Sequence, residues 1–129
     1  MNSTLVNKSY LFALVFLLGC DNSENDEINC TTEAVPAITI SVTDKESGQS
    51  INCGVTALIE DTNFSEELIN PDSDNCDNTL MLNGAFERGG IYNVHVYKDG
   101  YLDWSQYNIE VTKNTCHVAT VVVEAVLEK

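Results

Sequence analysis

The amino-acid sequence predicts an all-β domain, an antiparallel two-sheet Greek-key sandwich, behind an N-terminal targeting segment. From Pro36 onward, apolar residues recur at every second position, which is the period of a half-buried strand. The apolar runs are short and are separated by turn residues. About 90 of the 129 residues remain for this region, which is the size of one sandwich domain.

Six segments carry the strand pattern, and polar turns separate them. The predicted strands are residues 38–43, 53–60, 79–86, 92–97, 109–111 and 117–127. The turn signals are residues 44–48, 89–90, 99–100 and 113–114. The longest predicted loop covers residues 61–78, and residues 66–69 within it are expected to form one helical turn.

The charge balance is strongly acidic. The chain has 20 Asp and Glu residues against 6 Lys and Arg residues, a formal net charge of −14. Such a chain repels polyanions, which excludes a nucleic-acid partner, while 43% hydrophobic residues exclude wholesale disorder.

Residues 1–19 have the pattern of a signal peptide. Lys8 precedes an apolar run that is too short to span a bilayer as a helix. The run ends in Leu17-Leu18-Gly19-Cys20, which resembles the bacterial lipobox. This resemblance implies that Cys20 carries diacylglycerol and palmitate, becomes the new N-terminus and anchors the protein to a membrane.

Residues 20–36 are predicted to form a lipidated acidic tether ahead of the sandwich at residues 37–129. Four carboxylates follow Cys20 directly, so this segment is expected to be extended. The stretch resembles the acidic segment of surface-exported bacterial lipoproteins, whereas Asp21 alone resembles an inner-membrane retention signal. The expected location is the bacterial cell envelope, on the periplasmic or the surface face of the outer membrane.

Three sequence stretches resemble a known family. They are VTDKESGQSINCGVTALIED, GAFERGGIYNVHVYKDGY and IEVTKNTCHVATVVVEAVL. Together they are similar to the carboxypeptidase regulatory-like domain, a transthyretin-like sandwich, in its bacterial lipoprotein branch with GAxERxGxY and CHV motifs. The resemblance covers residues 37–127 and implies a noncatalytic accessory module. Gly89 departs from the proline that is common in that branch.

Four cysteines remain once Cys20 is assigned to lipid, and they allow three disulfide connectivities. Alternating directions along the predicted strands place Cys53 and Cys116 at one end of the sandwich. The same count places Cys30 and Cys76 at the other end. Only cysteines at the same end can approach within about 7 Å between Cα atoms, so the predicted pairs are Cys53 with Cys116 and Cys30 with Cys76.

Motifs for chemistry are sparse. Cys116 and His117 with Cys53 lack the paired spacing of a structural zinc site, and His117 is expected to be a hydrogen-bonded strand residue at a sheet edge. No nucleophile elbow, zinc-protease motif or phosphate loop occurs, so no enzyme activity is expected. Glu87 and Arg88 are interpreted as an ion pair that fixes a turn.

The loop residues Asp72, Asp74 and Asp77 are candidate calcium ligands. Their oxygen atoms suit the ion, but the loop lacks the glycine and the glutamate that an EF-hand requires. A solvated loop without metal is the alternative interpretation.

Four aromatic residues near one predicted turn form a candidate ligand surface. They are Tyr97, Tyr101, Trp104 and Tyr107. Aromatic side chains of this kind either bind partners or pack against a core.

The sequence therefore predicts a noncatalytic, membrane-anchored envelope lipoprotein that acts as a binding or assembly accessory. Its expected partners are the membrane and an envelope protein or glycan, and no cofactor is expected. The alternative is a carbohydrate- or calcium-dependent surface adhesion protein.

Overall fold

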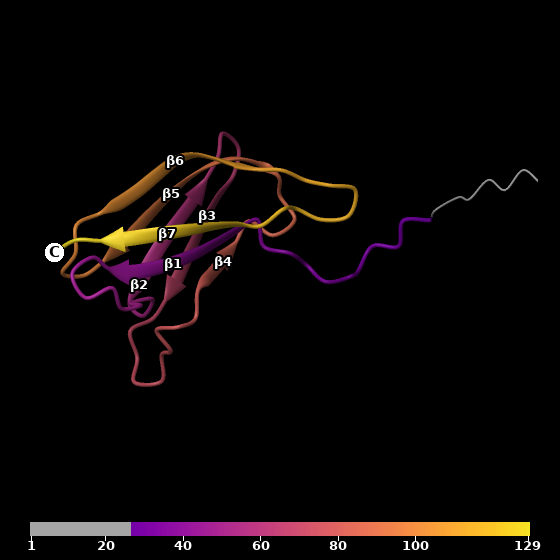
Figure 1. Ribbon diagram of the computed structural model, residues 1–129. Helices are drawn as coiled ribbons and strands as arrows, with labels where there is room; N and C mark the ends of the chain where they lie inside the picture. Colours follow the sequence, from indigo (N-terminus) through magenta and orange to yellow (C-terminus); the bar gives the residue numbers. More distant parts are fainter. Residues whose placement is uncertain (1–26) are drawn as a thin grey trace, which may run out of the picture.

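Seven β-strands form two sheets that pack face to face in the computed structural model, which describes residues 27–129 (Figure 1). The predicted signal peptide, the predicted lipid site Cys20 and the first residues of the predicted tether lie outside the described residues. The strands are β1 (Ile38–Asp44), β2 (Val55–Glu60), β3 (Ser65–Asn70), β4 (Leu82–Gly84), β5 (Gly90–Lys98), β6 (Trp104–Val111) and β7 (Val121–Leu127). The predicted all-β sandwich is confirmed.

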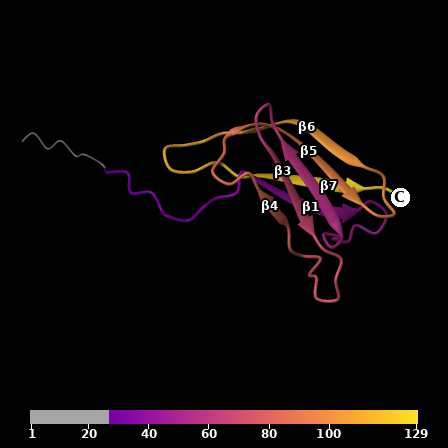
Figure 2. The same ribbon diagram turned by 180° about the vertical axis from the view of Figure 1, so that it is seen from behind.

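The strand order is β4-β1-β7 in the smaller sheet and β3-β2-β5-β6 in the larger one. Neighbouring strands are antiparallel except β1 and β7, which run parallel from Ile38 opposite Val121 to Asp44 opposite Leu127. Both strands run from the end where the N-terminal segment enters toward the end where the C-terminus lies (Figures 1 and 2). The alternating strand directions predict that the last strand runs antiparallel to the first, and this prediction is therefore wrong.

The core lies between the two sheets and follows the alternation seen in the sequence. In β2 and β5 every second side chain is buried, and the intervening ones face outward. The largest fully buried side chain is Tyr92, whose hydroxyl donates a hydrogen bond to the Arg88 carbonyl at 2.8 Å. No helix in residues 27–129 is long and apolar enough to cross a membrane.

Strand β3 replaces the helical turn predicted at residues 66–69. It forms a hairpin with β2 through a tight turn, in which the Asp61 amide donates to the Phe64 carbonyl at 2.9 Å. The strand was hidden in the sequence because it is an edge strand with no fully buried residue. Other predicted strands differ in length: the segment expected at residues 79–86 is only three residues long, and the one at 109–111 begins at Trp104.

The two disulfides join Cys30 to Cys116 and Cys53 to Cys76, so both predicted pairs are wrong. The cause is β3, because one additional strand before Cys76 returns the chain to the end where Cys53 lies. The same reversal carries Cys116 to the end where Cys30 lies. The Cα atoms of the pairs are 5.3 Å and 5.9 Å apart, respectively.

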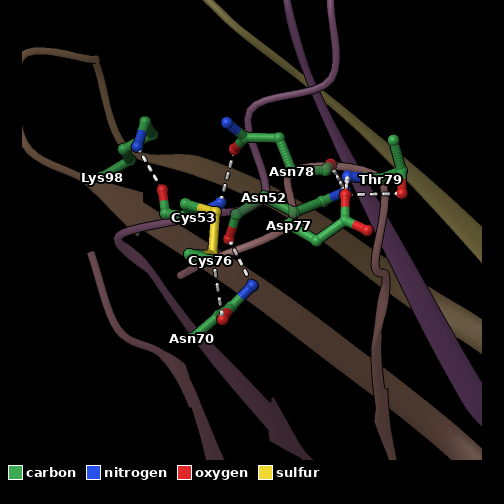
Figure 3. Close-up of a disulfide and its surroundings, with 8 residues drawn as sticks. All are labelled: Asn52, Cys53, Asn70, Cys76, Asp77, Asn78, Thr79 and Lys98. Carbon is green, nitrogen blue, oxygen red and sulfur yellow. Dashed lines mark hydrogen bonds between the residues drawn. A yellow bond between two sulfur atoms is a disulfide. The ribbon is translucent and has the colours of Figure 1, made fainter. Parts of the chain in front are cut away.

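Asn52 ties the two sheets together beside the Cys53–Cys76 disulfide (Figure 3). Its side chain is buried, accepts a hydrogen bond from the Val42 amide of β1 at 2.8 Å and donates to the Asn78 carbonyl at 2.6 Å. The Asn70 side chain, at the end of β3, donates to the Asn52 carbonyl at 2.9 Å. Buried polar groups with all partners in place fix one arrangement of the chain.

Candidate binding surface

The outward side of the larger sheet is the candidate site, and we call it the outer sheet face. No strand of the smaller sheet covers it, because the sheets pack through their other sides. Tyr107 and Ile69 on this face are 59% and 65% exposed. The face consists of Thr56, Leu58, Glu60, Ser65, Glu67, Ile69, Ile91, Asn93, His95, Tyr97, Ser105, Tyr107 and Glu110.

A β-bulge places Tyr107 on this face. Simple alternation would bury Tyr107 together with Ile109 and Val111, which follow it at every second position. The register between β5 and β6 shifts between Tyr92 and Val94, and Asn108 adopts a φ of 56°. The additional residue of the bulge reverses the side to which the first half of β6 points its side chains.

His95 lies at the centre of a polar row across the outer sheet face. Its Nδ1 atom is 2.7 Å from Ser105 Oγ, and its Nε2 atom is 3.3 Å from Glu60 Oε1. The Tyr107 ring packs edge-on against the imidazole, with 5.7 Å between the ring centroids. Alternating positions in β2, β5 and β6 bring these side chains together. The row cannot be predicted from periodicity, because it depends on which strands are neighbours and in which register.

The four aromatic residues predicted as one ligand surface divide into two groups. Tyr97 and Tyr107 stand on the outer sheet face and are exposed. Trp104 and Tyr101 are partly buried and pack against the core. The structure thus brings only two of the four predicted residues to the same open face.

Tyr101 holds a carboxylate at the end of the sandwich where the C-terminus lies. Its hydroxyl donates to Asp44 Oδ2 at 2.7 Å, while Asp44 Oδ1 accepts hydrogen bonds from the amides of Glu46 and Ser47. Lys129 Nζ is 3.7 Å from Asp44 Oδ2. The Tyr101 hydrogen bond, followed by those from Ser47, holds the pKa of Asp44 far below its ordinary value.

We expect Tyr101→Phe to lower the stability at neutral pH by raising the pKa of Asp44 toward its ordinary value. A depressed carboxylate pKa contributes stability above the unfolded-state value of about 4, and this contribution is lost as the pH falls toward the folded-state value. The difference from wild type should therefore shrink between pH 4 and pH 2. Urea unfolding across this range tests it, with Tyr107→Phe as the exposed control. A difference that does not change with pH contradicts the assignment.

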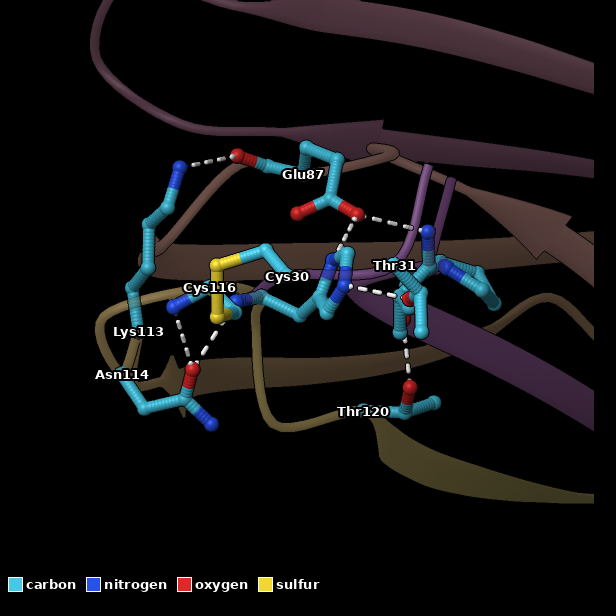
Figure 4. A network of polar contacts seen from close by, with 10 residues as sticks. Cys30, Thr31, Glu87, Lys113, Asn114, Cys116 and Thr120 are labelled. Atoms are coloured by element: carbon cyan, nitrogen blue, oxygen red, sulfur yellow. Dashed lines mark hydrogen bonds and ion pairs between the residues drawn. A yellow bond between two sulfur atoms is a disulfide. The ribbon is translucent and has the colours of Figure 1, made fainter. Parts of the chain in front are cut away.

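A second polar network fastens the N-terminal segment to the opposite end of the sandwich (Figure 4). Glu87 Oε1 accepts a hydrogen bond from the Val35 amide at 2.8 Å, and the Glu87 amide donates to the Val35 carbonyl at 2.9 Å. His117 bridges Glu87 and Thr31 through its two ring nitrogens, at 2.8 Å and 2.9 Å. The Val35 amide and then His117 lower the pKa of Glu87. Together with the Cys30–Cys116 disulfide, these contacts attach the described chain to the sandwich from Cys30 onward.

These contacts correct two predictions. Glu87 pairs with His117, and Arg88 instead lies over the Phe64 ring, 4.3 Å from its centroid, so the two neighbours do not form the expected ion pair. His117 belongs to the connection before β7 and not to a strand. Glu87 adopts a φ of 56°, which turns the side chains of Glu87 and Arg88 toward different partners.

The three aspartates proposed as calcium ligands lie in the connection between β3 and β4. Asp77 accepts hydrogen bonds from the amide and the hydroxyl of Thr79, which lower its pKa. Among residues 27–129, no group of three or more His, Cys, Asp or Glu side chains is arranged to hold a metal ion. Asp72, Asp74 and Asp77 do not form such a group.

No protein-family model, curated protein or solved structure matches the chain.

Proposed function

We propose that this protein is a lipid-anchored, noncatalytic binding or assembly module of the bacterial cell envelope. The observation that carries the proposal is the fixed entry of the chain at one end of the sandwich. Cys20, the residue of the lipobox-like motif, lies ten positions before Cys30, which a disulfide joins to Cys116. A lipid on Cys20 would thus hold the sandwich by this end and leave the outer sheet face open beside the membrane.

The two disulfides support an envelope location. Disulfides form and persist in oxidising compartments such as the periplasm and the cell surface. The same argument supports the N-terminal segment as an export signal, because a protein must leave the cytoplasm to form such bonds in most bacteria.

The polar row on the outer sheet face does not favour catalysis. His95 contacts Ser105 through one ring nitrogen and Glu60 through the other, which is the arrangement of nucleophile, base and carboxylate in a catalytic triad. They stand on an open sheet surface, where a reacting group would have neither a water-excluding pocket nor an evident oxyanion site. We infer that the row positions Tyr107 for binding.

We also propose membership in the carboxypeptidase regulatory-like family. The proposal rests on the three sequence stretches and on the sandwich architecture.

A glycan is the second candidate ligand. The exposure of Tyr97 and Tyr107 on one face favours it, because aromatic rings stack on the apolar faces of sugars.

Metabolic labelling with an alkyne palmitate in the native host tests the anchor. Wild type is expected to carry the label and to sediment with membranes. Cys20→Ala should lose the label and accumulate as an unprocessed chain, whereas Cys30→Ala should keep the label, because Cys30 lies outside the motif. Equal labelling of wild type and Cys20→Ala would refute the lipid anchor.

A further inference from the structure

We propose that the outer sheet face is the docking site for a protein partner with a basic surface. This inference rests on the proposed function and names the class of partner. It follows from the charges on the face, from its exposed aromatic rings and from the groove that continues it at one edge.

The charge on the outer sheet face has one sign. Glu60, Glu67 and Glu110 stand on it, and the face contains no lysine or arginine. Each basic side chain of residues 27–129 contacts a group away from this face. Lys45 pairs with Glu128, Arg88 lies over the Phe64 ring, and Lys98 donates to the Cys53 carbonyl. Lys113 donates to the Glu87 carbonyl, and Lys129 lies over the Tyr101 ring. A basic partner surface would complement the face and be steered toward it.

Two exposed tyrosines provide the contacts that orient such a partner. The faces of the Tyr97 and Tyr107 rings attract lysine and arginine side chains, and tyrosine is enriched among the residues that dominate binding energy. Tyr107 is held by its edge-on contact with His95, which is fixed in turn by Ser105 and Glu60. A ring that is already oriented loses little conformational entropy on binding.

A groove enlarges the surface beyond the sheet. The four strands are six to nine residues long. They give roughly 500 Å² of flat area, which is less than one side of a standard interface. At the β3 edge the face continues into a groove between β3 and the segment that leads into β4. Ile69 belongs to both surfaces, and the groove adds Leu80 and Met81, which are 62% and 47% exposed.

The same charges argue against a second copy of this chain as the occupant. Pairing two outer sheet faces would place glutamates against glutamates, in a chain whose net charge is −14. Like charges in contact oppose association.

Site-specific photocrosslinking in intact cells tests the proposal with the full chain. Tyr107→p-benzoylphenylalanine places the crosslinker on the outer sheet face. Val122→p-benzoylphenylalanine places it on the smaller sheet, where Val122 is 56% exposed. We expect a protein adduct from position 107 and at least a tenfold lower yield from position 122. Mass spectrometry should locate the crosslinked peptide in a lysine- or arginine-rich surface of the partner.

A matched pair of charge variants shows whether the face itself is recognised. Glu60→Gln with Glu67→Gln and Glu110→Gln removes three charges from the face. The control, Glu33→Gln with Glu46→Gln and Glu124→Gln, removes three charges from exposed positions elsewhere. The face variant should reduce the adduct from position 107 at least tenfold, and the control less than twofold.

Several outcomes would overturn the proposal. They are an equal loss in both charge variants, an adduct with a second copy of this chain, a glycan adduct, an acidic crosslinked surface, and no adduct at position 107. An adduct from position 122 with none from position 107 would refute this face and leave the proposed binding function standing. No adduct from either position would count against this face and against the proposed binding function.

Discussion

Replacing Cys30 and Cys116 together by serine should lower the free energy of unfolding by about 4 kcal/mol. The disulfide joins residues 86 positions apart, and the chain-entropy account gives about 4.6 kcal/mol for a loop of this length. Part of this free-energy loss is recovered because residues next to Cys30 gain conformational entropy in the folded variant. Urea unfolding at pH 7, extrapolated to water, measures the change.

Replacing Cys53 and Cys76 together by serine is the matched comparison. These residues are 23 positions apart, so the same account gives about 3.4 kcal/mol. The comparison is informative because, under either alternative pairing, each double variant would remove one partner from both bridges, and the two variants would then lose the same stability. Equal losses from the two variants would therefore contradict the assignment.

Tyr92→Ala should cost about 3 to 5 kcal/mol, because it leaves a large cavity between the sheets. The Tyr92 ring is fully buried and meets the Phe64 ring edge-on, with 6.2 Å between centroids. Phe64 in turn lies beneath the Arg88 guanidinium, so the truncation also removes support from the segment before β5. Urea unfolding measures the loss. An unchanged dependence of the unfolding free energy on urea concentration shows that the substitution changes stability and not the surface exposed on unfolding.

Two control substitutions show that the expected loss comes from the buried ring of Tyr92. One removes only the hydroxyl of Tyr92, and the other removes an exposed tyrosine ring. Tyr92→Phe keeps the ring and loses only the hydrogen bond to the Arg88 carbonyl, so it should cost about 1 kcal/mol. Tyr107→Ala removes an exposed ring on the neighbouring strand and should stay within about 0.5 kcal/mol of wild type. Equal losses from Tyr92→Ala and Tyr107→Ala would show that the two rings do not differ in burial.

The sequence was informative where burial alternates cleanly. Strands β2 and β5 alternate between buried and outward side chains, and β1 does so from Ile40 onward, so apolar periodicity predicted all three. It failed at β3, whose Ser65-Glu66-Glu67-Leu68 pattern reflects an edge position with partial burial. That one missed strand reversed every later strand direction, which produced both wrong disulfide pairs and the wrong direction for β7.

The candidate site was predicted only in part, because a bulge is invisible to periodicity. Tyr97 follows the buried Val96 and is outward by simple alternation, whereas Tyr107 has the same parity as the buried Ile109. Only the shift at Asn108 turns Tyr107 outward. Tyr101 and Trp104 looked equivalent to these residues by type and spacing, but their partial burial depends on contacts with the core that the sequence does not reveal.

A tryptic map of the membrane-extracted protein under non-reducing conditions is the most direct test of an anchored module with two disulfides. Cleavage sites at Lys45, Arg88 and Lys113 separate the cysteines into three peptides. We predict that peptide 20–45 begins with a lipid-modified Cys20 and is linked to peptide 114–129, while peptide 46–88 holds its own disulfide. A single species joining all three peptides, or an unmodified chain that begins before Cys20, would contradict this structure and its proposed anchor.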